Sequence, residues 1–123
     1  MPFKFSVGPW NVSSGADVYG PATRSEIPME EKIRKFKELG FDAVQFHDDD
    51  AVPNINELTE EEIKAEARKV RALLDEVGLK AEFVAPRLWM DPHCVDGGFT
   101  SNSEEDRKFA LWRAFRSIDI ARE

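Results

Sequence analysis

Apolar and polar positions alternate with two different periods along the chain, and the periods predict strands followed by helices. Residues 3–10, 41–47 and 79–86 are short stretches rich in apolar side chains, which is typical of strands. Between and after them, apolar residues recur every three to four positions, which is typical of amphipathic helices. The order predicted is therefore strand, helix, strand, helix, strand, helix.

Residues that start or stop helices bound the predicted helical segments. The first helix begins near Pro28, which suits a first helical turn, and ends at Gly40. The second begins with the capping box Thr59-x-x-Glu62 and ends at Gly78. The faces predicted from helical spacing are Met29, Ile33 and Phe36 on the first helix, Ile63, Ala67, Val70, Leu74 and Val77 on the second, and Leu111, Phe115 and Ile118, beside Trp112, on a third helix capped by Ser103.

A repeated strand–helix–strand order predicts an α/β fold with parallel strands. The second and third strands carry apolar residues on both faces, as a buried parallel sheet requires. Three strands leave both edges of a sheet open, and a closed (β/α)₈ barrel needs roughly 250 residues. The last helix also reaches Glu123 without a stop signal. We therefore expect residues 1–123 to be the N-terminal portion of a single TIM-barrel domain, supplying its first three βα units, or a chain completed by partners.

Composition and charge narrow the class of protein. Hydrophobic residues make up 41% of the 123 positions, which is typical of a globular domain. The net charge of −7 argues against nucleic acid or an anionic membrane as a partner. The one cysteine fits a reducing compartment, and neither a secretory signal nor an apolar run of about 20 residues is apparent. We expect a cytoplasmic protein.

Side chains able to do chemistry gather where the predicted strands end. Ligands of α/β proteins bind at the carboxyl ends of parallel strands, which here read Trp10, then His47 to Asp50, then Arg87 to Trp89. The spacing lets a turn bring the Asp50 carboxylate back to one ring nitrogen of His47 and fix its tautomer. The other nitrogen would then face a pocket as a general acid or base.

Other interpretations of these residues stay open. His47 could have a structural role only, as a hydrogen-bonding partner within its loop. The aspartates would then be solvated charges or helix caps. His and Asp also bind divalent metals, although "HDDD" has no established ligand spacing and adjacent side chains do not naturally point at one ion. Trp10 and Trp89 belong either to the core or to an apolar wall against a ligand. Tyr19, in a glycine-flanked loop, is either exposed decoration or a contact with a partner.

The segments "VGPW", "DVYGPATR", "FHDDDAVP" and "DGGFTS", in this order, resemble the N-terminal third of xylose isomerase, closest to the class I, actinobacterial-type enzymes. The resemblance covers essentially the whole chain. It implies a TIM barrel that forms homotetramers and interconverts aldose and ketose sugars, D-xylose with D-xylulose and D-glucose with D-fructose. It also implies two divalent cations, Mg²⁺, Mn²⁺ or Co²⁺, and a cytoplasmic role in xylose metabolism.

The resemblance further implies roles for individual residues. His47 would contact the sugar's ring and anomeric oxygens and help to open the ring, and Asp50 would orient it. Trp10 and Trp89 would form the pocket wall, and Tyr19 would reach into a neighbouring subunit's active site. The family's metal ligands and catalytic lysine lie on later strands, outside this chain, so residues 1–123 alone are expected to be inactive.

Three departures from the family and three alternatives accompany this resemblance. Trp89 and Tyr19 stand where the family usually has phenylalanine, and the family has a less bulky, uncharged residue near the position of Arg87. One alternative is a related barrel, such as a metal-dependent sugar epimerase. Another is a metal-dependent phosphodiesterase, which would favour a basic rim. The third is a non-catalytic fragment that pairs with other chains through its open strands.

Overall fold

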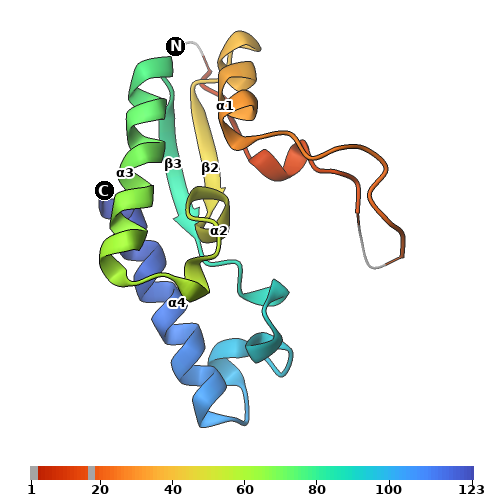
Figure 1. Cartoon of the computed structure of the whole chain (residues 1–123), viewed down its shortest axis with the longest axis vertical. Coiled ribbons are helices and arrows are strands. Elements are labelled where there is room, and N and C mark those ends of the chain that lie inside the picture. Colours follow the sequence, from red (N-terminus) through yellow and green to blue (C-terminus); the bar gives the residue numbers. More distant parts are fainter. Residues whose placement is uncertain (1–2, 17–18) are drawn as a thin grey trace.

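The computed structural model describes residues 3–16 and 19–123, and its elements follow the predicted alternation of strands and helices (Figure 1). Three strands, β1 (Ser6–Val7), β2 (Ala43–His47) and β3 (Lys80–Ala85), form a parallel sheet in the order β1-β2-β3. The prediction of an α/β fold with parallel strands is therefore confirmed.

The main helices are α1 (Met29–Glu38), α3 (Glu60–Val77) and α4 (Glu104–Arg122), and a single turn, α2 (Asp48–Ala51), follows β2 directly. Short 3₁₀ turns fill the connections: η1 (Pro9–Asn11), η2 (Ile55–Glu57), η3 (Leu88–Met90), η4 (Pro92–Cys94) and η5 (Gly98–Thr100). In the described part of the chain, no helix is both long and apolar enough to span a membrane.

The helix boundaries follow the capping signals of the sequence. The Thr59 backbone N–H donates to Glu62 Oε2 at 2.8 Å, and the Glu62 N–H donates to Thr59 Oγ1 at 3.4 Å. Gly78 ends α3 with a φ of 78°, a left-handed conformation that glycine adopts without strain. The Ser103 hydroxyl accepts from the Asp106 N–H at 3.3 Å and caps α4. The predicted capping box and both of these boundaries are confirmed.

The first strand is shorter than the predicted stretch 3–10. The carbonyl of Phe5 accepts from the N–H of Asp42 at 2.8 Å, and the paired strand then covers only Ser6–Val7. Pro9 has no N–H to donate to a neighbouring strand and instead occupies the first position of η1. Proline thus ends the strand early, and its turn places Trp10 at the carboxyl end of β1.

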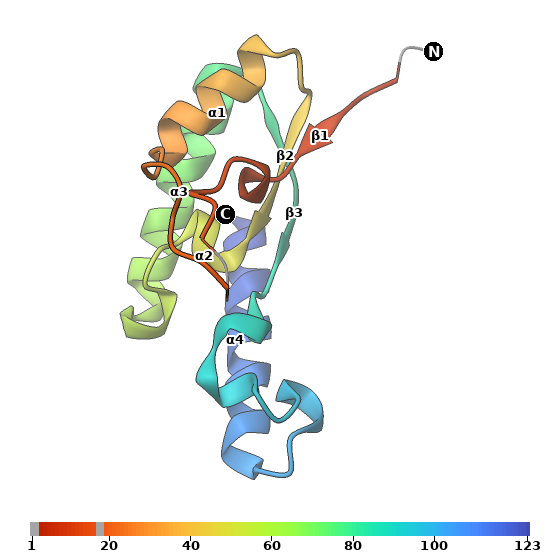
Figure 2. The ribbon, with the colours of Figure 1, turned by 90° about the vertical axis from the view of Figure 1, so that its right-hand side faces the viewer.

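All three long helices pack on one face of the sheet, as Figure 2 shows for α1 and α3 beside β2 and β3. One core cluster joins side chains of the three long helices and β2: Ile33 and Phe36 of α1, Val44 and Phe46 of β2, Ile63, Ala67 and Leu74 of α3, and Ile120 of α4. The other face of the sheet carries Gln45, which donates to Glu82 Oε2 at 2.8 Å and to Ser6 Oγ at 3.0 Å. Opposite Gln45, Phe83 is 42% exposed.

The rotation of α4 about its axis differs from what its apolar spacing suggests. Leu111, Phe115 and Ile118 do share a face, but each of them is at least half exposed. The buried side of α4 instead carries Arg113 and Ser117, together with small or aliphatic residues. A polar interaction with β2, rather than an apolar stripe, therefore sets which side of α4 faces the core.

That interaction is centred on Asp48, whose side chain is completely buried. Its Oδ2 accepts from Arg113 Nε at 2.8 Å and lies 3.2 Å from Ser117 Oγ. Its Oδ1 accepts from the backbone N–H groups of Asp49 at 2.9 Å and Arg87 at 3.0 Å. A buried carboxylate is tolerated only when donors and an opposite charge surround it, and Asp48 has both.

Replacing Asp48 by asparagine keeps the side-chain shape but leaves the buried Arg113 charge with the Asp91 carboxylate at 3.9 Å in place of Asp48 at 2.8 Å. Breaking a buried ion pair in this way is expected to lower the free energy of unfolding by about 3–5 kcal/mol, measured by urea denaturation. The matched control is Glu104→Gln, the same carboxyl-to-amide change in an exposed pair with Lys108 on the same helix. We expect the control to cost less than about 1 kcal/mol. Equal losses in the two variants would contradict the role of Asp48.

Candidate functional site

The carboxyl ends of the three parallel strands lie at the same end of the sheet. Side chains that are far apart in sequence come together there. Trp10 lies in η1 directly after β1, His47 is the last residue of β2, and Arg87 and Trp89 follow β3. The sequence-predicted residues Trp10, His47, Asp50 and Trp89 all belong to this group. We refer to the group formed by these residues and Arg87 as the strand-end cluster.

The imidazole of His47 lies between two indole rings. Its centroid is 4.5 Å from that of Trp10, with the planes tilted by 48°, and 5.0 Å from that of Trp89, edge to face. The His47 side chain is only 13% exposed, whereas Trp89 is 66% exposed at the rim. The two indoles thus form apolar walls around one titratable ring, and Trp89 is open to contact with a ligand.

Gly8 allows the Trp10 indole to occupy this position. A Cβ atom added at Gly8 would lie 2.1 Å from the indole Cε2, which no real pair of atoms tolerates. The Trp10 ring therefore lies against the backbone at the end of β1. The "VGPW" segment has a local physical reason: glycine makes room, proline forms the turn, and tryptophan packs on both.

The turn of α2 brings Asp50 back to His47. The backbone N–H of His47 donates to Asp50 Oδ2 at 3.1 Å, and the ring Nδ1 lies 3.2 Å from the same oxygen. Asp50 is itself only 16% exposed. The carboxylate thus contacts both the backbone and the ring of His47, and this contact orients the imidazole.

The sequence places Arg87 at the end of the third strand but does not predict its contacts with the other residues of the cluster. Its Nη2 donates to Asp50 Oδ1 at 2.6 Å and lies 3.0 Å from His47 Nδ1. Its Nε lies 2.9 Å from Asp49 Oδ1. Burial raises the pKa of the Asp49 carboxyl above its ordinary value, and the Arg87 charge opposes that shift. The sequence did contain a signal for these contacts: an acidic run ends one predicted strand, and an arginine follows the next.

The three consecutive aspartates therefore differ in the partners they contact. Asp48 binds Arg113 in the core, Asp49 pairs with Arg87, and Asp50 contacts both Arg87 and His47. Because each carboxylate is directed at a guanidinium, the set does not fit a divalent cation. Within residues 3–16 and 19–123, no group of three or more His, Cys, Asp or Glu side chains is arranged to hold a metal ion.

Tyr19, His93 and Cys94 lie outside the strand-end cluster. Tyr19 is 95% exposed on the loop that projects from the body of the molecule between η1 and α1 (Figure 1). His93 Nδ1 lies 3.0 Å from Asp106 Oδ1, which raises the pKa of His93, and its ring stacks on Phe109 at 4.6 Å. Burial raises the pKa of the Cys94 thiol, so it is no activated nucleophile.

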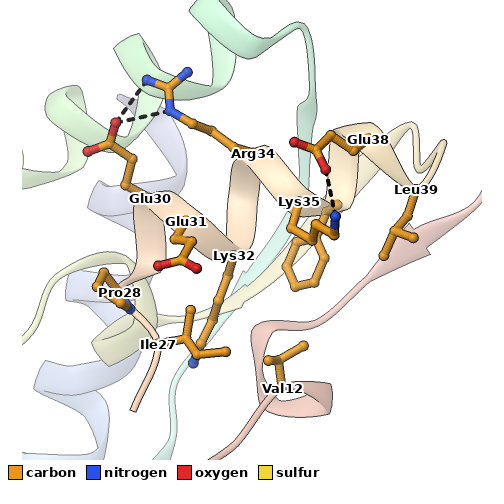
Figure 3. A pocket seen from close by; sticks show the side chains of 11 residues that line it. Val12, Ile27, Pro28, Glu30, Glu31, Lys32, Arg34, Lys35, Glu38 and Leu39 are labelled. Atoms are coloured by element: carbon orange, nitrogen blue, oxygen red, sulfur yellow. Dashed lines mark hydrogen bonds and ion pairs between the residues drawn. The ribbon is translucent and has the colours of Figure 1, made fainter. Parts of the chain in front are cut away.

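A hollow of about 720 Å³ lies along α1, and Figure 3 shows its lining of apolar side chains and long charged ones. The charged groups there pair with one another, Glu30 with Arg34 at 2.8 Å and Lys35 with Glu38 at 2.7 Å. None of its lining residues belongs to the strand-end cluster. The strand-end cluster and this hollow are therefore in different places.

A comparison of the chain with models of known protein families finds no match. The function of the chain is therefore inferred from the geometry of the strand-end cluster and from the ordered sequence segments "VGPW", "DVYGPATR", "FHDDDAVP" and "DGGFTS".

Replacing Gly8 by alanine is expected to displace the Trp10 indole from His47. The carbon-bound ring protons of His47 lie beside two indoles, so loss of one shifts their NMR resonances toward those of an exposed histidine. Gly20→Ala is the matched control, because a Cβ atom at Gly20 meets nothing within 4 Å. His47 resonances that stay in place in Gly8→Ala, or move equally in both variants, would contradict the packing described.

Proposed function

We propose that this chain forms the first three βα units of a TIM barrel that isomerises aldose and ketose sugars, similar to xylose isomerase. One observation carries the proposal: an imidazole oriented by a carboxylate, between two indoles, at the carboxyl ends of parallel strands. Two segments that resemble the family supply three of these four side chains, since Trp10 ends "VGPW" and His47 and Asp50 lie in "FHDDDAVP". Trp89 lies outside the resembling segments.

The chemistry of ring opening fits this cluster. A cyclic aldose opens when the anomeric hydroxyl loses a proton and the ring oxygen gains one, and a histidine of fixed orientation suits such transfers. The apolar faces of Trp10 and Trp89 would pack against the carbon skeleton of the sugar and keep water from it. His47 would contact the sugar oxygens, and Asp50 would keep the imidazole in the orientation that this contact needs.

The arrangement of strands and helices favours a barrel over a doubly wound sheet. In a doubly wound sheet the strand order reverses at a switch point and helices cover both faces. Here the strands follow in sequence order, and one core cluster contains residues of all three long helices. A barrel is built in this way, with helices outside and the other face of the sheet turned toward its axis.

Exposed apolar surface supports packing against further polypeptide. Leu111, Phe115 and Ile118 form an apolar face on α4, and Phe83 is exposed on the helix-free face of the sheet. Large apolar side chains gathered on one exposed helix face are typical of surfaces that bind protein. We propose that later barrel units cover them, and that Tyr19 reaches a neighbouring subunit in a homotetramer.

Two divalent cations, Mg²⁺, Mn²⁺ or Co²⁺, would supply Lewis-acid chemistry in the cytoplasmic enzyme and bind to residues outside this chain. We propose that residues 1–123 bind the sugar and orient it. A phosphodiesterase is less well supported, because it would need a basic rim for phosphate. The cation at this rim, Arg87, is already bound to Asp49 and Asp50.

Sugar binding can be followed on the chain itself through its three tryptophans. Titration with D-xylose is expected to shift the indole N–H resonances of Trp10 and Trp89. Trp112, which packs near Phe109 on α4, is the internal control and should not respond. Equal shifts of all three indoles, or none at any sugar concentration, would contradict the proposed site.

In the complete barrel, His47→Asn is expected to lower the Mg²⁺-dependent conversion of D-xylose to D-xylulose by about 10²–10⁴-fold, the usual contribution of one general acid or base. Lys69→Met, at an exposed position on α3, is the control and should keep full activity. An unchanged rate of ring opening in His47→Asn would remove the proposed role of this histidine.

A further inference from the structure

We infer that Arg87 is a positioning residue that sets the tautomer of His47: it holds the neutral imidazole with its proton on Nε2, not on Nδ1. The inference depends on two short contacts to the same ring nitrogen. His47 Nδ1 lies 3.0 Å from Arg87 Nη2 and 3.2 Å from Asp50 Oδ2. These two neighbours demand opposite states of that nitrogen.

A guanidinium nitrogen only donates hydrogen bonds, and an ionised carboxylate only accepts them. If Nδ1 carried the proton, it could donate to Asp50, but its hydrogen would face a hydrogen of Arg87 at close range. If Nδ1 carries a lone pair, it accepts from Arg87, and the proton is on Nε2. Arg87 and Asp50 thus compete to decide the tautomer.

Asp50 does not need the ring proton. Its Oδ2 already accepts from the His47 backbone N–H at 3.1 Å, and its Oδ1 accepts from Arg87 at 2.6 Å. Arg87 Nη2 has two hydrogens, of which one goes to Asp50 and the other is free for Nδ1. The arrangement with the proton on Nε2 gives Nδ1 and the guanidinium a hydrogen bond at 3.0 Å, at the cost of the Nδ1 lone pair facing Asp50 Oδ2 at 3.2 Å. The other arrangement sets two hydrogens against each other at the shorter of these distances, and we infer that its cost is the larger one.

The guanidinium is held in this position independently of His47. Its Nε pairs with Asp49 at 2.9 Å, and the backbone N–H of Arg87 donates to the buried Asp48 at 3.0 Å. No described residue hydrogen-bonds His47 Nε2. The structure therefore fixes the donor on one side of the ring and leaves the opposite nitrogen to a ligand.

For a sugar, and resting on the proposed function, this tautomer makes His47 a hydrogen-bond donor toward an acceptor such as the ring oxygen. Taking a proton from the anomeric hydroxyl needs a lone pair on Nε2. That state requires Nδ1–H facing Asp50, so Arg87 must first give up its hydrogen bond to Nδ1. Arg87 would thus control when Nε2 of His47 can accept a proton. The uncharged residue that the xylose isomerase family has near this position would not exert such control.

The test is a measurement of the ring ¹⁵N chemical shifts by long-range ¹H–¹⁵N correlation, at a pH where both histidines are neutral. The chain has two histidines, and His93 is the internal control, because its Nδ1 contacts the Asp106 carboxylate at 3.0 Å. In the unmodified chain we expect the protonated-nitrogen shift at Nε2 of His47 and at Nδ1 of His93. Arg87→Met should move the His47 proton to Nδ1 and leave His93 unchanged.

The two outcomes are distinct, and neither depends on sugar turnover. A His47 ring that carries its proton on Nδ1 in the unmodified chain overturns the inference, whatever any variant does. So does an Arg87→Met variant with unchanged His93 shifts in which His47 stays protonated at Nε2. Arg87→Lys, which keeps the charge without the planar fork, should give an intermediate population. Failure of the sugar experiments would leave these tautomer results unaffected.

Discussion

The buried carboxylate of Asp48 is the interaction on which the rest of the structure depends. It lies at the junction of β2, β3 and α4 and has contacts with Arg113 and Ser117 of the helix and with the backbone of Arg87. A carboxylate with no access to water is stable only in such a shell of donors. The ends of two strands and one side of α4 are therefore fixed relative to one another by a single side chain.

The strand-end cluster follows from that constraint. With Asp48 held in the core, the turn of α2 directs Asp49 and Asp50 toward Arg87, whose backbone Asp48 also holds. The same turn brings Asp50 to the ring of His47. The same acidic run therefore has a structural and a proposed chemical role. Its first carboxylate, Asp48, stabilises the fold, and its last, Asp50, orients the histidine.

Much of this could be predicted from the sequence because the responsible forces are local. Helix caps such as Thr59 and Gly78 depend on residues within one turn, so their spacing predicts them. The meeting of His47 with the two indoles was also predictable, since parallel strands end at the same edge of a sheet. These features needed only the order of elements and the rule for where their ends lie.

The features that could not be predicted depend on contacts between distant segments. The exposed apolar face of α4 results from Arg113 binding Asp48, 65 positions away in sequence. Apolar spacing alone does not reveal that such a contact sets the rotation of the helix. Likewise, the sequence shows Arg87 only as a departure from the xylose isomerase family near the predicted pocket. Its contacts with Asp49 and Asp50 are apparent only in the structure.

The most direct test of the account is the set of nuclear Overhauser contacts between the ring protons of His47 and the indole protons of Trp10 and Trp89. Ring centroids at 4.5 Å and 5.0 Å predict contacts to both indoles in the same sample. Contacts to only one indole, or to neither, would show that the strand ends do not enclose this histidine. The functional argument would then lose its basis.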